Sequence, residues 1–348
     1  MNGAPADEIL LVVDGTAYFG WTALEVERSI EAMAGSFSLD LAAKERTALP
    51  DWPLAEGAAC TVTLAGKTLI TGWIDEIDRS LGPEERSLRI RGRDRTGDLV
   101  DCSAVNSPGS WRNRPLAAIA TALLEPFGIA LDVEGDQGKP FARFALQQGE
   151  SVFEAIERMA RYRGLVAFSR GDGRLVVGNP DSAIVAGSLR EGDNVLRIEA
   201  RRNQAERFSE YLVKGQSSGS DARSGASVAQ VAARASDAGI TRYRPLTLIG
   251  EEQSDRAALS RRAKWEAAVR SGRGHRVTAT VPGWFSTPGT PWTPGRRVSV
   301  RAPSVDVDEE MLVERVRLTR DGQNGTVSEI DAVPPQAWTQ LPETEPKQ

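Results

Sequence analysis

Two stretches of this chain, more than two hundred residues apart, carry the same series of structural signals. Each has an alternating strand pattern, a loop with a tryptophan, a glycine, a second strand and a third strand that opens a hairpin. The copies are 36–77, with Trp52 and Gly57, and 275–316, with Trp292 and Gly295. Alternation of apolar and polar residues is typical of half-buried strands. We therefore predict two related β units that share one strand order and superpose with their tryptophans on corresponding loops.

Helical patterns interrupt the β patterns in the middle of the chain. The stretch from Ser107 to Pro115 is rich in Pro, Gly and Ser, as segment boundaries are. Two amphipathic helices and a hairpin follow it, and Val152, Ile156 and Met159 share one face of the second helix. This order of elements predicts a small α+β domain.

The patterns together predict a mainly β protein with an α+β insert. The expected segments are a first β-barrel domain at 1–106, a small α+β domain at 107–183, a second β-barrel domain at 184–335 and a tail at 336–348. Inside the second barrel we expect a mobile loop at 217–239, because small polar residues fill it. We also expect a helix at 254–271 with Ser254 as its N-cap.

The residue types on which most catalytic sites depend are sparse. His275 is the single histidine, and no P-loop, dinucleotide-binding glycine motif or paired-cysteine motif is present. Cys60 and Cys102 lack metal-ligand spacing and fit a protein made in a reducing cytoplasm. We predict no enzymatic activity, no catalytic or metal-binding residues and no cofactor.

Charge and hydropathy exclude two further classes of function. The 348 residues include 48 acidic and 43 basic side chains, a net charge of -5 that argues against specific nucleic-acid binding. No apolar run approaches the roughly 20 residues of a membrane-spanning helix. The N-terminus lacks the basic segment and the cleavage site of a signal peptide, so we expect neither a membrane segment nor export by that route.

One run of alternating arginines is the candidate interaction site. Its members are Arg89, Arg91, Arg93 and Arg95. The run can form a solvated face balanced by the neighbouring strand, with Asp78 opposite Arg89 and Glu76 opposite Arg91. It can also form a subunit interface, because guanidinium groups suit carboxylates of another chain. Both interpretations remain open on the sequence alone.

A segment of the α+β domain offers a rival interpretation of the function. Residues 148–164, QGESVFEAIERMARYRG, resemble the opening of a LysM peptidoglycan-binding module. The alternative function is therefore a peptidoglycan-binding module or a cell-wall hydrolase. Any capped amphipathic helix that ends in Gly164 would show the same pattern.

Several phrases, in order along nearly the whole chain, resemble one known family. They are DGTAYFGWTALEVERSIEAMAGSFSLDLA, TRYRPLTL, RAKWEAAVRSGRG, TVPGW and PWTPGRRVSV. The ordered set resembles the baseplate hub proteins of Mu-like contractile-tailed phages. The resemblance implies a homotrimer whose two barrels per chain form a pseudo-six-fold ring. Such a ring adapts the hexameric tail tube to the trimeric central spike.

The resemblance also implies partners and a location. The partners would be the tail tube protein, the central spike protein, other baseplate proteins and the tape measure protein. The location would be the tail baseplate of a virion or a prophage particle, assembled in the cytoplasm of the bacterial host. In such a ring we expect the arginine run at the subunit boundary and a neutral or acidic lumen, because exposed arginines would hold passing DNA.

Overall fold

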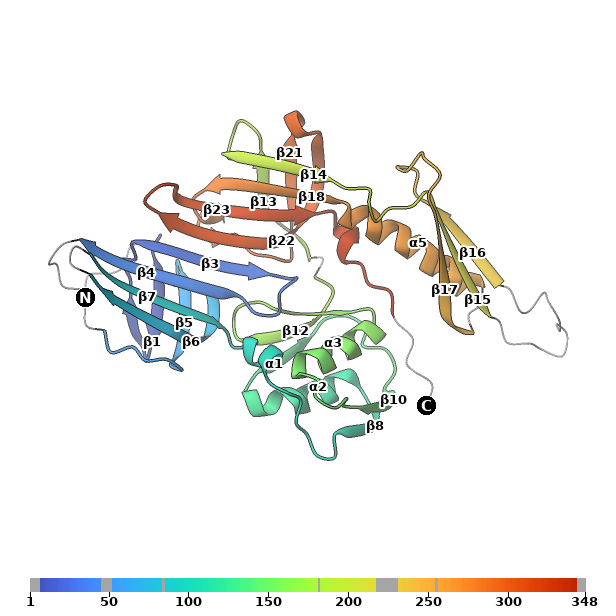
Figure 1. Cartoon of the computed structure of the whole chain (residues 1–348), viewed down its shortest axis with the longest axis horizontal. Helices are drawn as coiled ribbons and strands as arrows, with labels where there is room; N and C mark the ends of the chain where they lie inside the picture. Colours follow the sequence, from blue (N-terminus) through green and yellow to red (C-terminus); the bar gives the residue numbers. More distant parts are fainter. Residues whose placement is uncertain are drawn as a thin grey trace.

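The computed structural model describes residues 7–44, 52–82, 85–180, 182–216, 231–253 and 256–342. Strands dominate it, and thirteen of them form one continuous sheet. Figure 1 shows this sheet above a compact group of helices, with a further helix and three strands extending to one side.

The N-terminal strands make the first β unit. They are β1 (Ile9–Val13), β2 (Thr16–Tyr18), β3 (Ala23–Ser29), β4 (Ser36–Lys44), β5 (Ala59–Leu64), β6 (Lys67–Leu81) and β7 (Glu85–Asp94). Apart from β2, an edge strand that pairs antiparallel with β1 alone, the hydrogen-bonded order is β3-β4-β7-β6-β5-β1. All of these pairings are antiparallel.

The C-terminal half contributes the second β unit. Its strands are β13 (Ser182–Arg190), β14 (Arg197–Arg202), β18 (His275–Pro282), β21 (Arg296–Ala302), β22 (Val307–Asp321) and β23 (Gly325–Val333). Their order is β14-β18-β23-β22-β21-β13. When the six strands of each unit are numbered along the chain, both units have the order 2-3-6-5-4-1. The predicted common strand order is confirmed; one difference is that β13 pairs in parallel with β21.

A matched pair of irregularities relates the two units residue by residue. Gly57 and Gly295 both have positive φ, 78° and 73°. The Gly57 N–H donates to the Ile74 carbonyl at 2.7 Å, and the Gly295 N–H donates to the Val313 carbonyl at 2.8 Å. A register shift of the β-bulge type begins at each acceptor, in β6 and in β22. Ile74 and Val313 are therefore equivalent positions.

Strands at both ends of the first unit's sheet contribute buried apolar residues to one common core. Ile9 of β1 and Val62 of β5 belong to the same buried cluster as Val26 of β3 and Ile90 of β7, so the two ends of the sheet face each other. The Trp21 indole N–H donates to the Ile9 carbonyl at 3.1 Å and joins those ends. Core residues of the second unit continue this cluster without a break.

The middle of the chain forms an α+β region, and its first helix lies before the expected boundary at residue 107. Its elements are α1 (Gly97–Asp101), β8 (Ser110–Arg114), α2 (Leu116–Leu124), η1 (Glu125–Phe127), β9 (Ala130–Val133), β10 (Phe141–Ala145), α3 (Val152–Tyr162), β11 (Val166–Ser169) and β12 (Arg174–Gly178). The face of α3 that holds Val152, Ile156 and Met159 is buried, as predicted. Ser151 and Glu154 form a capping box, and Gly164 has φ +66° just after the helix. The LysM-like pattern is thus a capped amphipathic helix in this fold.

Two close contacts fix the α+β region to the first β unit. The Ser169 hydroxyl donates to the Asp94 carboxylate at 2.9 Å, and the Thr96 N–H donates to the same carboxylate at 3.0 Å. Burial raises the pKa of Asp94, and these hydrogen bonds oppose that rise. Gly171, at φ +83°, passes so near the Leu69 carbonyl that a Cβ atom would lie 2.0 Å from its oxygen. A side chain at this position would separate the two parts.

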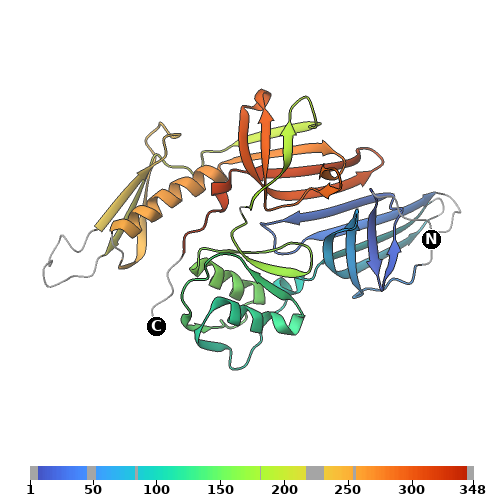
Figure 2. The same cartoon turned by 180° about the vertical axis from the view of Figure 1, so that it is seen from behind.

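Part of the loop expected at 217–239 is a strand of a third structural unit. The elements are β15 (Glu210–Gln216), β16 (Val231–Ser236), β17 (Pro245–Gln253) and α5 (Arg256–Arg273), which both views show projecting from the sheet (Figures 1 and 2). The loop expected at 217–239 is wrong over β16, because Ala233 of that strand packs against Leu259 and Ala263 of α5. Residues 217–230 and the expected N-cap Ser254 lie outside the described residues.

Short elements complete the second unit, and one of them lies within the expected tail. They are β19 (Phe285–Thr287), β20 (Thr290–Pro291), η2 (Pro303–Val305) and η3 (Pro335–Trp338). The tail expected from residue 336 is wrong at its start, because Ala337 is buried and the Trp338 indole donates to Glu314 at 3.1 Å. Within the described ranges, no helix is both long and apolar enough to cross a membrane.

Candidate functional site

The two β units meet along one pair of strands. β3 of the first unit pairs antiparallel with β22 of the second, from Leu24 opposite Arg320 to Ser29 opposite Arg315. β3 also pairs with β4, so the sheet runs without interruption from one unit to the other. We call this pairing the in-chain junction.

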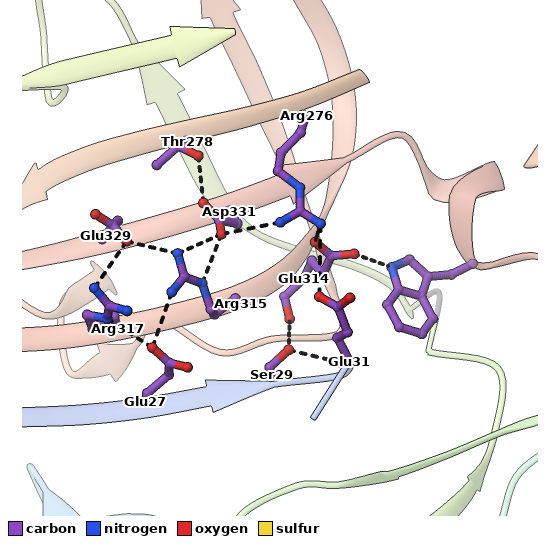
Figure 3. A network of polar contacts seen from close by, with 11 residues as sticks. Glu27, Ser29, Glu31, Arg276, Thr278, Glu314, Arg315, Arg317, Glu329 and Asp331 are labelled. Atoms are coloured by element: carbon purple, nitrogen blue, oxygen red, sulfur yellow. Dashed lines mark hydrogen bonds and ion pairs between the residues drawn. The ribbon is translucent and has the colours of Figure 1, made fainter. Parts of the chain in front are cut away.

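Arg315 is the centre of the polar side of the in-chain junction (Figure 3). Its guanidinium contacts Asp331 at 2.8 Å, Glu329 at 2.9 Å and Glu27 of the first unit at 3.2 Å. Burial alone would lower the pKa of Arg315, but Asp331, Glu27 and Glu329 together raise it. The Thr278 hydroxyl donates to Asp331 at 2.7 Å, so this carboxylate has a partner on both neighbouring strands.

Arg317 adds a second link across the in-chain junction. It lies 2.9 Å from Glu27, and it lies 3.9 Å from Glu25, further along the same strand. The second unit thus presents a basic edge, and the first unit presents an acidic one. Opposite charges on facing strands fix the register as well as the pairing.

Glu314, the extra residue of the β22 bulge, closes one end of the in-chain junction. It is 5% exposed, and its carboxylate lies 2.5 Å from the Arg276 guanidinium. Burial raises the pKa of Glu314, while the charge of Arg276 lowers it. The Glu314 carbonyl accepts hydrogen bonds from the Ile30 N–H at 3.0 Å and the Ser29 hydroxyl at 3.2 Å. The bulge therefore holds the end of β3 in place.

The opposite side of the in-chain junction is apolar. Val26 of β3 lies opposite Leu318 of β22, and both are almost fully buried. Leu24 and Val316 lie in the same buried cluster. Burial of apolar surface contributes about 25 cal/mol per Å², so this side supplies much of the stability and the polar side supplies the register.

The arginine run lies on β7, and its predicted pairing is confirmed. Glu76 of β6 is opposite Arg91, Asp78 is opposite Arg89, and Ile77 is opposite Ile90. The contacts are Arg91 with Glu76 at 2.6 Å and Asp78 at 3.5 Å, Arg93 with Asp101 at 2.8 Å and Asp75 at 2.9 Å, and Arg89 with Asp40. The first interpretation, an arginine face balanced by in-chain carboxylates, describes this arrangement.

Two members of the run differ in environment. Hydrogen bonds from Arg93 to Asp101 and Asp75 raise the pKa of its guanidinium. Arg95 lies just beyond the end of β7, where it stacks 5.6 Å from the centre of the Trp73 ring. The strand therefore presents three arginines on one face, and the role of the run at a subunit boundary stays a prediction.

The remaining candidates for chemistry have structural surroundings. His275 begins β18 and lies 3.2 Å from Glu309, and burial lowers the pKa of its imidazole. Burial also raises the pKa of the Cys60 thiol to about 12, which keeps it protonated at neutral pH. Over the part of the chain that the structure describes, no group of three His, Cys, Asp or Glu side chains could hold a metal ion.

Sequence reasoning missed the in-chain junction. Arg315 and Arg317 alternate with apolar residues along β22 as the arginines of β7 do, and the sequence carries this signal. Alternation alone does not show which strand is the neighbour, and Glu27 is 288 residues from Arg315. The pairing of distant strands therefore could not be assigned.

Family models of phage baseplates match three segments of the chain. The model of the N-terminal domain of the Mu phage baseplate assembly protein GpP-like matches residues 8–94. The model of the second domain of the baseplate hub protein gp44-like matches 96–179, and the model of the fourth domain of the Mu phage baseplate assembly protein GpP matches 255–341. The second of these covers the helix that resembled a LysM opening.

Individual proteins match over almost the full length. The baseplate hub protein gp44 of Escherichia phage Mu is 32% identical over 337 residues, which cover 94% of this chain and 88% of that protein. The crystal structure of the 43 kDa tail protein of prophage MuSo2 from Shewanella oneidensis has a TM-score of 0.84 at 33% identity, covering 96% of this chain and 100% of that one. A tail protein from Neisseria meningitidis has a TM-score of 0.79 at 26% identity, covering 97% and 99%.

Proposed function

This chain belongs to the family of Mu-like phage baseplate hub proteins, and we propose that three copies of it form the ring that joins the tail tube to the central spike. The family supports a structural role in the baseplate of a phage tail. The ring, its stoichiometry and its two neighbours are the proposal.

The observation that carries the proposal is the repeated β unit. Both units have the strand order 2-3-6-5-4-1 and a matched glycine and bulge, so one chain presents two similar surfaces in tandem. Three chains therefore present six similar units with true three-fold symmetry. Such a ring matches a six-fold tube on one side and a three-fold spike on the other, because each partner meets a surface of its own symmetry.

The partners follow from this position. One face of the ring would contact the tail tube protein and the other the central spike protein, with other baseplate proteins and the tape measure protein as further neighbours. The site of action would be the virion baseplate, with assembly in the cytoplasm of the bacterial host. The peptidoglycan-binding alternative loses its basis, since the hub-domain match at 96–179 includes α3.

The arginine run belongs beside a subunit boundary in this proposal. Arg91 bridges Glu76 and Asp78, which lie on the last part of β6, where β7 is the neighbouring strand. Because carboxylates of the same chain balance Arg89, Arg91 and Arg93, a lumen next to this face would be close to neutral. Passing DNA would find no uncompensated positive surface there.

Sedimentation velocity of the purified full chain, at about 10 µM, is expected to show a particle of three copies. Arg91→Glu with Arg93→Glu should shift the particle toward the monomer, because the subunit boundary would lose two guanidinium groups that can pair with carboxylates and gain two negative charges beside Glu76 and Asp75. The monomer should stay folded, since exposed ion pairs contribute only about 0–1 kcal/mol.

Arg301→Glu is the matched control for this double variant. Arg301 lies on β21 with 70% of its side chain exposed, and its one ion pair among the described residues is with Asp308 at 3.9 Å. The control should sediment as the unaltered chain does. A monomeric unaltered chain would contradict the proposed ring, and an unchanged Arg91/Arg93 variant would show that the run only meets solvent.

A further inference from the structure

Among the strand edges that have no neighbour in the described structure, two belong to β14 and to the last part of β6. β14 pairs with β18 alone, and the last part of β6, from Glu76 to Leu81, pairs with β7 alone. An exposed edge is a row of unpaired N–H and C=O groups that can bind another strand. These two edges lie in different β units.

The two free edges are equivalent to the two strands of the in-chain junction. Since Ile74 is equivalent to Val313, the last part of β6 corresponds to the part of β22 that binds β3. The register across the sheets extends this relation. Val26, Phe37, Gly92 and Ile74 form one row, and Ala200, Val277, Ala332 and Val313 form the other. β14 therefore corresponds to β3, with Ala200 at the position of Val26.

We propose that β14 of one chain pairs antiparallel with the last part of β6 of a second copy of this chain. The register is that of the in-chain junction, which places Arg201 opposite Asp78, as Glu27 lies opposite Arg317. This between-chain junction rests on the proposed ring and specifies which strands close it. The in-chain and between-chain junctions would then have the same antiparallel direction and the same register.

Charge at the two free edges is complementary in this register. The β6 edge keeps an acidic excess, because Glu76 and Asp78, each about half exposed, share the one guanidinium of Arg91. Arg201 of β14 is exposed and has no ion pair within the described part of the chain. The in-chain junction pairs a basic β22 with an acidic β3. In the between-chain junction the equivalent of β22, which is β6, is acidic, and the equivalent of β3, which is β14, is basic. Pairing of the wrong edges would bring like charges together, which disfavours it.

Apolar side chains at the same edges have no cover in the single chain. Leu81, at the end of β6, is 75% exposed, and Leu196, just before β14, is 64% exposed. In the proposed register, Leu81 lies opposite Ile198. The corresponding residues of the in-chain junction, Arg320 and Leu24, face each other across paired strands, and Leu24 is 4% exposed. A second copy would give Leu81 a similar cover.

The connectivity makes the contact head-to-tail. Within one chain an eight-strand path runs from β14 through β18, β23, β22, β3, β4 and β7 to β6. Its two ends are the free edges, so each added copy leaves the same two ends available. A head-to-tail contact of this kind closes into a ring when the rotation per chain allows. Three copies would then share one closed sheet.

Charge exchange tests the register in the full chain. Asp78→Arg alone and Arg201→Asp alone should each raise the concentration at which half the chain is trimeric, by about tenfold or more, because each places like charges face to face. The double variant Asp78→Arg with Arg201→Asp should regain most of the lost association. Thermal unfolding of each variant monitors its fold.

Cross-linking tests the same contact without charge effects. Asp78→Cys with Arg201→Cys, in a Cys102→Ser background, should form a covalent three-chain species under mild oxidation, and each single cysteine variant should not. Facing residues of antiparallel strands have Cα atoms about 4.5–5.5 Å apart, within reach of a disulfide. Cys60 is buried and should stay unreactive.

The outcomes separate the two proposals. A trimer that shows neither regained association in the double charge variant nor the covalent species overturns the between-chain junction and leaves the ring in place. A chain that stays monomeric before any substitution overturns the ring, and the between-chain junction with it. Regained association together with the covalent species supports both.

Discussion

Gly92→Ala is expected to destabilise the first β unit more than any other single-residue change considered for this chain. A Cβ atom at Gly92 would lie 2.1 Å from the Trp73 carbonyl oxygen and 2.5 Å from the Phe37 ring. The carbonyl belongs to the neighbouring strand β6, so the clash cannot be relieved by turning a side chain. Forced overpacking costs about 1–3 kcal/mol and more where backbone must move. We expect a loss at or above the upper end, measured by chemical denaturation.

The second β unit shows how this position is balanced. The position of Gly92 is taken by Ala332, and that of Phe37 by Val277, so a larger strand residue faces a smaller neighbour. Adding Phe37→Val to Gly92→Ala should therefore recover part of the lost free energy of unfolding, while the carbonyl contact remains. Gly322→Ala is the control, because a Cβ there meets nothing within 4 Å. A stability of Gly92→Ala equal to that control would contradict the packing described.

Arg315→Met is expected to weaken the in-chain junction by about 3 kcal/mol, because it removes the closest charged partner of the buried Asp331 carboxylate. Asp331 is 3% exposed and would keep only Thr278 and the more distant Arg276 as partners. Methionine retains much of the arginine stem, so the change reports mainly on charge and hydrogen bonding. The free energy of unfolding from denaturant titration gives the effect.

Arg301→Met controls for the loss of an exposed arginine from the same unit. Its ion pair with Asp308 is 3.9 Å long and largely exposed, so the free energy of unfolding should change by less than about 0.5 kcal/mol. Hydrogen exchange localises the effect of Arg315→Met, since amides of β3 should exchange faster while those of α3 do not. Equal stability of the two variants would mean that the junction does not depend on this network.

Local signals predicted the parts of the fold that depend on neighbouring residues. The alternation in β6 and β7 gave the pairing of Glu76 with Arg91, because a short hairpin fixes which residues face each other. The spacing of Val152, Ile156 and Met159 gave the buried face of α3. The repeated glycine and strand signals gave the common strand order, since Gly57 and Gly295 lie at equivalent positions of the two units.

Signals that depend on distant residues were beyond the sequence. Val231–Ser236 form β16 because β15 pairs with one of its edges and α5 covers one of its faces, and small residues such as Ala233 gave no sign of it. The junction of β3 with β22 could not be predicted for the same reason. The pattern of a strand shows which residues share a face, but it does not identify the strand that pairs with each edge. For this reason the site predicted from the sequence lies on β7, which is the strand next to the free edge of β6.

Electron microscopy of the purified full chain tests the central claim most directly. Class averages viewed along the symmetry axis should show a ring with three-fold symmetry and six evenly spaced lobes, one for each β unit. The third unit, with α5, should add three smaller projections. A two-fold particle, or an open chain of subunits without closure, would contradict the account of this protein as a three-copy hub ring.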